Sequence, residues 1–134
     1  MRKTPMQLND IRAFSADQDR GVWFELLDPV THQATGIRLK VAGPDSEVQN
    51  RARLRLSDDL SDVADAEGKV SAEARERARL DSLASCVLAW EINEDGQPVP
   101  FSHANIVRLL KSATWVQAQI DAFASDRAAF RRAG

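Results

Sequence analysis

The fold is decided by residues 90–130, which read WEINEDGQPVPFSHANIVRLLKSATWVQAQIDAFASDRAAF. The apolar run before this stretch predicts a helix that ends at Trp90–Ile92. A polar turn at residues 93–96 and a short extended piece at 98–100 should follow, because glycine and proline interrupt regular structure there. The chain is therefore expected to change direction once before its last helices begin.

Two helices placed back to back complete this stretch. Ser102 is the expected N-cap of the first helix, and Thr114 with Gln117 fits a capping box that starts the second at Trp115 and carries it to Phe130. Apolar residues recur at helical spacing, and no nucleophile motif, metal cluster or phosphate loop accompanies them. Such a segment is typical of a protein that packs and binds other proteins rather than one that performs chemistry.

Composition places the chain among ordinary globular proteins. It has 134 residues, 43% hydrophobic and 28% charged, which is enough for one domain with a modest core. The formal net charge of -2 gives no general attraction to nucleic acid or to an acidic membrane. Its single cysteine excludes an internal disulfide, the N-terminus lacks a signal-peptide pattern, and no apolar run approaches the roughly 20 residues that span a bilayer. A cytoplasmic location is expected.

Residues 1–20 form an N-terminal arm without sustained periodicity. Two alternatives remain for this arm. It is either a loosely ordered terminus or a short amphipathic segment, carrying Leu8, Ile11 and Phe14, that docks on the body or on a partner.

Residues 21–43 predict a β-hairpin with one buried face. Apolar side chains alternate with polar ones in both strands, which are marked by Val22, Phe24 and Leu26 and by Ile37, Leu39 and Val41. Two strands alone are marginally stable in water. Helices must therefore cover the apolar face, or the strand edge must pair with another copy of the chain and give a homo-oligomer.

Residues 45–132 are predicted to contain the helices of the domain, interrupted by the turn and the extended piece at residues 93–100. Asp45 or Ser46 should cap the first of them, whose apolar stripe consists of Val48, Ala52, Leu56, Leu60 and Val63. Ser71 should start a second helix that runs to Trp90 with Cys86 in its interior. The expected fold class is α+β, mainly α, with a single domain over residues 21–134 in which the N-terminal hairpin packs on about four helices.

Residues that commonly carry chemistry are few. His32 and His103 have no cysteine or carboxylate at metal-ligand spacing, and a buried Cys86 would behave as a small apolar side chain. The acidic run at residues 58–67 lacks the alternating ligands and central glycine of a calcium loop. No catalytic, cofactor-binding or metal site is predicted, and the chain is not expected to be an enzyme.

Nucleic-acid binding is also disfavoured. Two arginine triplets occur, at positions 51, 53 and 55 and at positions 75, 77 and 79. Residues two apart on a helix point to nearly opposite sides, so neither triplet makes a continuous basic stripe. No aromatic residues are interleaved with them to stack on bases.

The pattern from Ala84 to Phe130 resembles the tail assembly chaperones of long-tailed bacteriophages and prophages. The resemblance covers about 110 residues, from Gly21 to Phe130, and includes the strand Arg38–Val41 in the hairpin. The segments that carry it most clearly are Cys86–Trp90, Gly96–Ser102, Asn105–Leu110, Trp115–Ile120, Phe123, Asp126, Arg127 and Phe130. These are packing and capping positions rather than a catalytic signature.

The resemblance implies a non-enzymatic assembly factor without a cofactor. Such a chaperone binds the tape-measure protein, and tail tube subunits as a further partner, before the tail tube polymerises. It acts in the host cytoplasm and is absent from the mature virion. The alternatives are a structural minor tail or head-tail connector protein of the virion, and a small DNA-binding regulator.

Partner binding is expected on the last two helices. A chaperone would mask apolar helices of an unassembled protein, and these helices would lie in a groove lined by aromatic and aliphatic side chains. The residues predicted to line that groove are Phe101, Ile106, Leu110, Trp115, Ile120 and Phe123.

Overall fold

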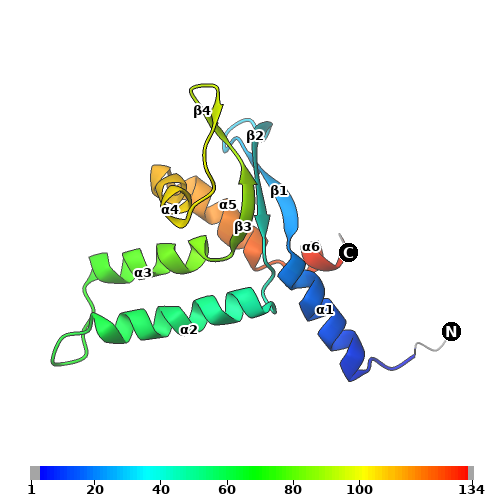
Figure 1. Ribbon diagram of the computed structural model, residues 1–134, viewed down its shortest axis with the longest axis horizontal. Helices are drawn as coiled ribbons and strands as arrows, with labels where there is room; N and C mark the ends of the chain where they lie inside the picture. Colours follow the sequence, from blue (N-terminus) through cyan, green and yellow to red (C-terminus); the bar gives the residue numbers. More distant parts are fainter. Residues whose placement is uncertain (1–3, 133–134) are drawn as a thin grey trace.

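The computed structural model describes residues 4–132 and has an α+β architecture dominated by helices (Figure 1). Strands β1 (Val22–Leu27), β2 (Ala34–Val41) and β3 (Val87–Glu91) form an antiparallel sheet in the order β1-β2-β3, and β4 (Asn93–Glu94) pairs with β5 (Gln97–Pro98) in a small hairpin. The helices of this region are α1 (Leu8–Arg20), α2 (Glu47–Asp62), α3 (Ala72–Ala84), α4 (His103–Ser112), α5 (Thr114–Ala124) and α6 (Arg127–Arg132). The predicted fold class is confirmed.

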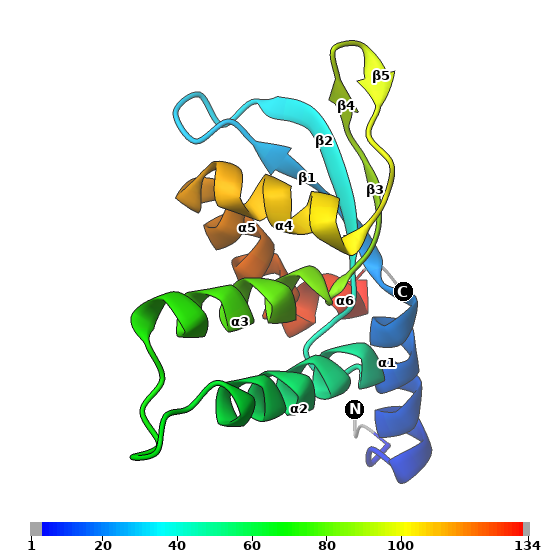
Figure 2. The same ribbon diagram turned by 60° about the vertical axis from the view of Figure 1, so that its left-hand side comes forward.

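The N-terminal hairpin is confirmed together with its buried face. Leu26 on β1 and both Leu39 and Val41 on β2 are fully buried. Helices α4 and α5 lie against one side of the sheet, as Figure 2 shows. The ring of Phe24 stacks on Phe123 of α5 with centroids 4.4 Å apart. The alternation of apolar residues therefore places the sheet correctly against its helical cover.

The predicted helix end at Trp90–Ile92 is wrong. Helix α3 stops at Ala84, and residues 87–91 form strand β3, which pairs with β2 so that Trp90 lies opposite Leu39. Cys86 consequently lies after the helix rather than within it. A short run of buried apolar residues fits either a helix or a strand, and here the open edge of β2 decides the outcome by offering backbone hydrogen bonds.

Side-chain caps follow the sequence at three helices and not at the fourth. Ser46, Ser71 and Ser102 each accept a hydrogen bond from the backbone N–H three residues later. Helix α5 instead begins at Thr114 without a side-chain cap, so the predicted capping box is wrong. The Gln117 amide donates to Leu110 O over 2.8 Å and thereby binds a carbonyl at the end of α4.

Helices α2 and α3 form a hairpin that projects from the body (Figure 1). Ala52 of the predicted stripe is buried between them, but Val63, at the far end, is 53% exposed. Among the described elements, α2 and α3 alone reach that end, so its apolar side chains are left open to solvent. The loop beyond it is organised by Asp65, whose carboxylate accepts from the N–H groups of Glu67 and Lys69.

The chain ends in a helix that the sequence does not separate from its predecessor. Helix α5 stops at Ala124, and α6 begins at Arg127, after Asp126 Oδ1 accepts the Ala128 N–H over 3.1 Å. This break turns α6 toward α1, and the two helices lie side by side in both views (Figures 1 and 2). The predicted arm therefore contains a helix over Leu8–Arg20, while residues 1–3 and 133–134 lie outside the described part.

Candidate partner-binding groove

The six residues predicted to line a groove lie in three different settings. Ile106, Leu110 and Ile120 are buried core residues, so they are closed to a partner in this conformation. Trp115 and Phe123 are partly buried and pack against the same core. Phe101 alone among them is largely open, at 47% exposure.

Burial of these residues has a clear packing reason. Helices α4 and α5 turn their apolar stripes toward the sheet, because the buried face of the hairpin needs that cover. Phe101 lies before α4, and its ring meets the edge of Trp90 at a centroid distance of 5.9 Å. The six residues therefore do not form one open groove, and a partner-binding role for the exposed Phe101 stays a prediction.

An apolar groove lies instead between α1 and α6. Its volume is about 620 Å³, which lies within the usual range of ligand sites. Ile11 and Phe14 line one wall, Phe130 and Arg131 line the other, and Met6 lies at the N-terminal end. This concavity is named the α1–α6 groove, and its lining is mostly apolar.

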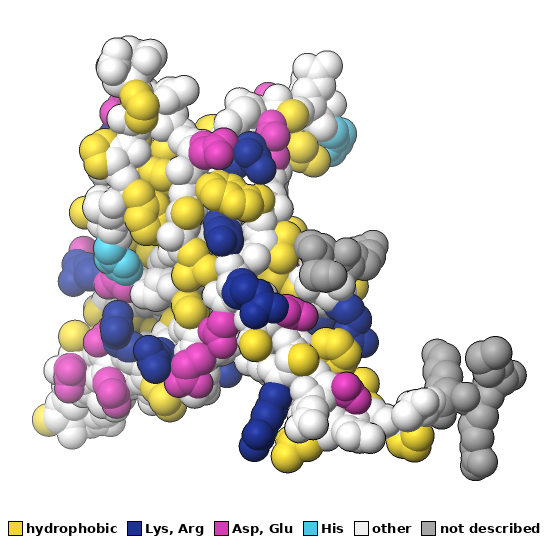
Figure 3. Space-filling model, turned by 45° about the vertical axis from the view of Figure 1, so that its right-hand side comes forward, with side chains coloured by type: hydrophobic (Ala, Val, Ile, Leu, Met, Phe, Trp, Pro, Cys, Tyr) yellow, Lys and Arg dark blue, Asp and Glu magenta, His cyan; other side chains and the backbone are white. Residues whose placement is uncertain are grey.

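Only part of the apolar face of α1 lines the groove, and much of this face is exposed to solvent. Leu8, Ile11 and Phe14 follow one another at three-residue spacing and therefore share one side of the helix. Met6, Leu8 and Ile11 are 59%, 62% and 52% exposed. Figure 3 shows hydrophobic side chains along the arm that leads toward the N-terminus, at the lower right of that face. Neighbouring exposed apolar side chains of this kind are typical of interaction surfaces.

The floor of the groove is continuous with the protein core. Phe130 is almost completely buried, and its ring lies 5.3 Å from that of Phe123, which stacks in turn on β1. Above the floor, the Arg131 guanidinium lies 3.9 Å from the centre of the Phe14 ring, a cation–π contact that joins the two walls. A ligand in the groove would thus rest on a rigid aromatic base.

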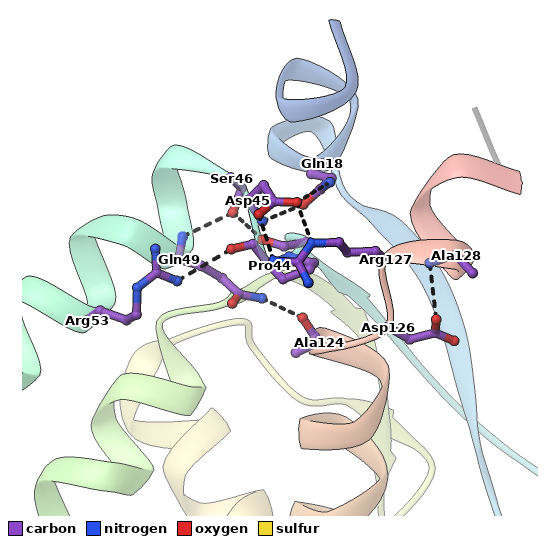
Figure 4. Close-up of polar contacts among 11 residues, drawn as sticks. Gln18, Pro44, Asp45, Ser46, Gln49, Arg53, Ala124, Asp126, Arg127 and Ala128 are labelled. Carbon is purple, nitrogen blue, oxygen red and sulfur yellow. Dashed lines mark hydrogen bonds and ion pairs between the residues drawn. The ribbon is translucent and has the colours of Figure 1, made fainter. Parts of the chain in front are cut away.

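Polar bonds fix α1 at the closed end of the groove (Figure 4). The buried Gln18 side chain donates to Asp45 Oδ2 over 3.2 Å and accepts from the Asp45 N–H over 2.5 Å. Arg127 of α6 binds the same carboxylate through two nitrogens, over 2.7 and 2.9 Å. These three residues, named here the α1 latch, join α1, the turn before α2, and α6.

Electrostatics and close packing both support the latch. The bidentate hydrogen bond from Arg127 lowers the pKa of Asp45 below its ordinary value, so the carboxylate is charged at neutral pH. Gly43 lies directly against Gln18, because a Cβ at this position would meet the Gln18 side chain at 2.7 Å. The glycine therefore permits the close approach of α1 to the turn.

A second amide secures the neighbouring elements. The Gln49 side chain donates over 2.8 Å both to Ala42 O, just after β2, and to Ala124 O, at the end of α5. Figure 4 shows the bond to Ala124. Because one side chain satisfies two carbonyls from distant elements, α2, β2 and α5 are held together beside the latch.

Within residues 4–132, no three histidine, cysteine or acidic side chains lie where they could hold a metal ion. His32 lies in the β1–β2 loop, and His103 Nε2 lies 3.2 Å from Asp81 Oδ1 at the surface. Burial raises the pKa of the Cys86 thiol to about 11, so that thiol is protonated at neutral pH.

Sequence reasoning identified one wall of this groove and missed the other. The spacing of Leu8, Ile11 and Phe14 marked a docking segment, whereas Phe130 and Arg131 were assigned to the end of a longer helix. The available signal was Asp126 before Arg127, since aspartate is a preferred residue at the start of a helix.

None of the helices in the described part is long and apolar enough to cross a membrane.

Residues 45–133 match the model of the YdaY prophage protein family. The chain belongs to that family. The matched part contains α6, Asp45 and Arg127, while α1 and the β1–β2 hairpin precede it. No curated protein and no solved structure matches the chain. The expected origin in a phage or prophage is thereby confirmed, at a coarser level than the tail assembly chaperones.

Proposed function

We propose that this prophage protein is a non-enzymatic assembly factor that holds an amphipathic helix of a partner in the α1–α6 groove. The observation that carries the proposal is the half-exposed apolar face of α1 beside that groove. An amphipathic helix inserts apolar residues at three- and four-residue spacing into such a groove. The wall residues Ile11 and Phe14 lie three positions apart on α1, which is also the spacing of the apolar residues on such a partner helix.

The partner that fits a prophage setting and the resemblance to tail assembly chaperones is the tape-measure protein, a long and helix-rich protein. Tail tube subunits are a second class of partner. Binding would act by mass action, because covering apolar helices lowers the concentration of free adhesive surface without any nucleotide. Such a factor works in the host cytoplasm and leaves before the virion matures.

Charge adds a preference to the groove. Asp45 neutralises Arg127, and Asp17 pairs with Arg20. Arg131, by contrast, has no carboxylate partner among the described residues, and its guanidinium lies over the Phe14 ring. A helix with an acidic residue beside its apolar stripe would gain an ion pair at this position.

Titration of the full chain with helical tape-measure peptides from the same prophage tests the proposal. Ile11→Ser should weaken binding by more than about 1 kcal/mol if Ile11 is an anchor. Ala13→Ser, on the exposed opposite side of α1, is the matched control and should bind normally. Loss of binding in Phe101→Ala with an unaffected Ile11→Ser would move the site to the C-terminal helices instead. Detection of the protein in purified virions would refute the chaperone role.

A further inference from the structure

The apolar face of α1 extends beyond what its own chain covers. Phe14 packs at the groove, whereas Ile11 and Leu8, about one and two turns closer to the N-terminus, remain more than half exposed. Both the groove and this uncovered face are apolar, and they adjoin one another on the same helix. A surface that carries both a site and a matching ligand is self-complementary, which is the property that a two-fold interface requires.

The charges next to this face are complementary in the same sense. Asp10 precedes Ile11, and only one of its carboxylate oxygens accepts a hydrogen bond, from Gln7 N at 2.8 Å. Arg131 stands on the opposite wall of the groove without an acidic partner among residues 4–132. An α1 helix thus has the chemistry that the groove should accept: an apolar stripe with an acidic residue beside it.

We propose that α1 of a second copy of this chain lies antiparallel in the α1–α6 groove, so that the free protein is a two-fold symmetric dimer. With the axis through Ile11, a residue k places after Ile11 lies beside the residue k places before it in the other copy. Ile11 then contacts Ile11 of the second copy, and Leu8 lies beside its Phe14. These contacts bury Leu8 and Ile11, which are exposed in the single chain.

The same arrangement brings the free charges together. On a helix of 3.6 residues per turn, Asp10 lies on the same flank as Phe14, the flank that faces α6. In an antiparallel pair that flank meets the corresponding flank of the other copy, so Asp10 approaches the Arg131 that stands over Phe14. Arg12 meets its own counterpart on the opposite flank, where water screens the repulsion.

The dimer would control access of a partner helix to the groove, an inference that rests on the proposed function. The second copy occupies the site where a partner helix would bind, so dimerisation and partner binding exclude each other. In the absence of a partner, the dimer would therefore keep the apolar face of α1 buried. Partner binding should then convert dimers into one-to-one complexes.

Cysteine cross-linking of the full chain tests the arrangement. Ile11→Cys brings two thiols together at the two-fold axis and should shift the protein from monomer to dimer on a non-reducing gel after mild oxidation. Ala13→Cys, which is also exposed but lies on the far side of α1, is the control and should remain monomeric. Native Cys86 does not interfere, because it is buried and its pKa is raised to about 11.

Sedimentation of the unmodified chain gives the second measurement. The expected result is twice the monomer mass at micromolar concentration and the monomer mass for Arg131→Glu. A wild-type monomer at all concentrations, or equal cross-linking at positions 11 and 13, would overturn the dimer. A tape-measure peptide that binds such a monomer would leave the proposed function standing. A dimer that no such peptide dissociates would retain the inference and refute the groove as the partner site.

Discussion

Gln18→Ala should release α1 while leaving the rest of the fold intact. The substitution removes the two hydrogen bonds between the Gln18 side chain and Asp45, at 3.2 and 2.5 Å. Each contributes about 1 kcal/mol net, so the free energy of opening α1 should fall by about 2 kcal/mol. Since 1.4 kcal/mol corresponds to a factor of ten, α1 should open about 30 times more often. Bonds to the Gln18 carbonyl from Gly21 N and Gly43 N remain in the variant.

Hydrogen exchange followed by mass spectrometry measures this opening directly. Amides of α1 should exchange about 30-fold faster than in the wild type, while those of β2 keep their rates, because local opening does not require global unfolding. Asn9→Ala, at an exposed position of α1, is the matched control and should not accelerate exchange, since alanine favours a helix. Unchanged α1 rates in Gln18→Ala would refute the latch. Equal acceleration in β2 would show that Gln18 supports the whole fold instead.

Three further predictions concern the latch and the core. Gly43→Ala should lower the melting temperature in a thermal scan, because its Cβ would meet the Gln18 side chain at 2.7 Å. Because Arg127 lowers the pKa of Asp45, their pair stabilises the fold above the ordinary carboxyl pKa, and this contribution is lost as the pH falls through the lowered value. Acid titration of Asp45→Asn should accordingly show a shallower loss of stability than the wild type. Iodoacetamide should modify Cys86 slowly at pH 8 and quickly after unfolding, because burial raises its pKa to about 11.

Local patterns predicted the elements that depend on neighbouring residues. The alternation in β1 and β2 gave the hairpin and its buried face, and three serines gave the helix starts. Each of these signals lies within a few residues of the structure that it determines. They are therefore readable from one sequence without knowledge of the tertiary fold.

Strand β3 could not be predicted in this way. Residues 87–91 read VLAWE, and this apolar run continues the helical spacing that begins after Ser71. Its conformation depends on pairing with β2, in which Arg38 Nη1 also binds Glu91 Oε2 over 3.1 Å across 53 positions. The sequence pattern does not show that one edge of β2 is open for pairing. Pairing with β2 therefore outweighed the local helical preference of residues 87–91.

The candidate groove likewise has one part that the sequence predicts and one part that depends on the tertiary fold. The spacing on α1 was visible in the sequence, but the groove also depends on long-range bonds, in which Asp45 binds Gln18 across 27 positions and Arg127 across 82. The residues predicted to line a groove on α4 and α5 are mostly buried in the core, because the apolar stripes of these helices pack against the sheet. Amphipathic spacing shows that a face will be covered, and the tertiary fold decides whether the cover comes from the same chain.

The position of the latch explains how α1 can act both as a wall and as a ligand. Asp45 and Arg127 both lie within the residues that match the prophage family, and Gln18 lies before them. The ion pair can form without α1. Helix α1 attaches to this region through the Gln18 side chain, through the Gln18 carbonyl that accepts from Gly43 N, and through the Asp19 carboxylate that accepts from Val48 N. An element held at one end by few bonds, and apolar at its other end, can exchange partners at low energetic cost. The exposed Leu8 and Ile11 lie at that second end, where a second copy or a partner helix would compete for the same surface.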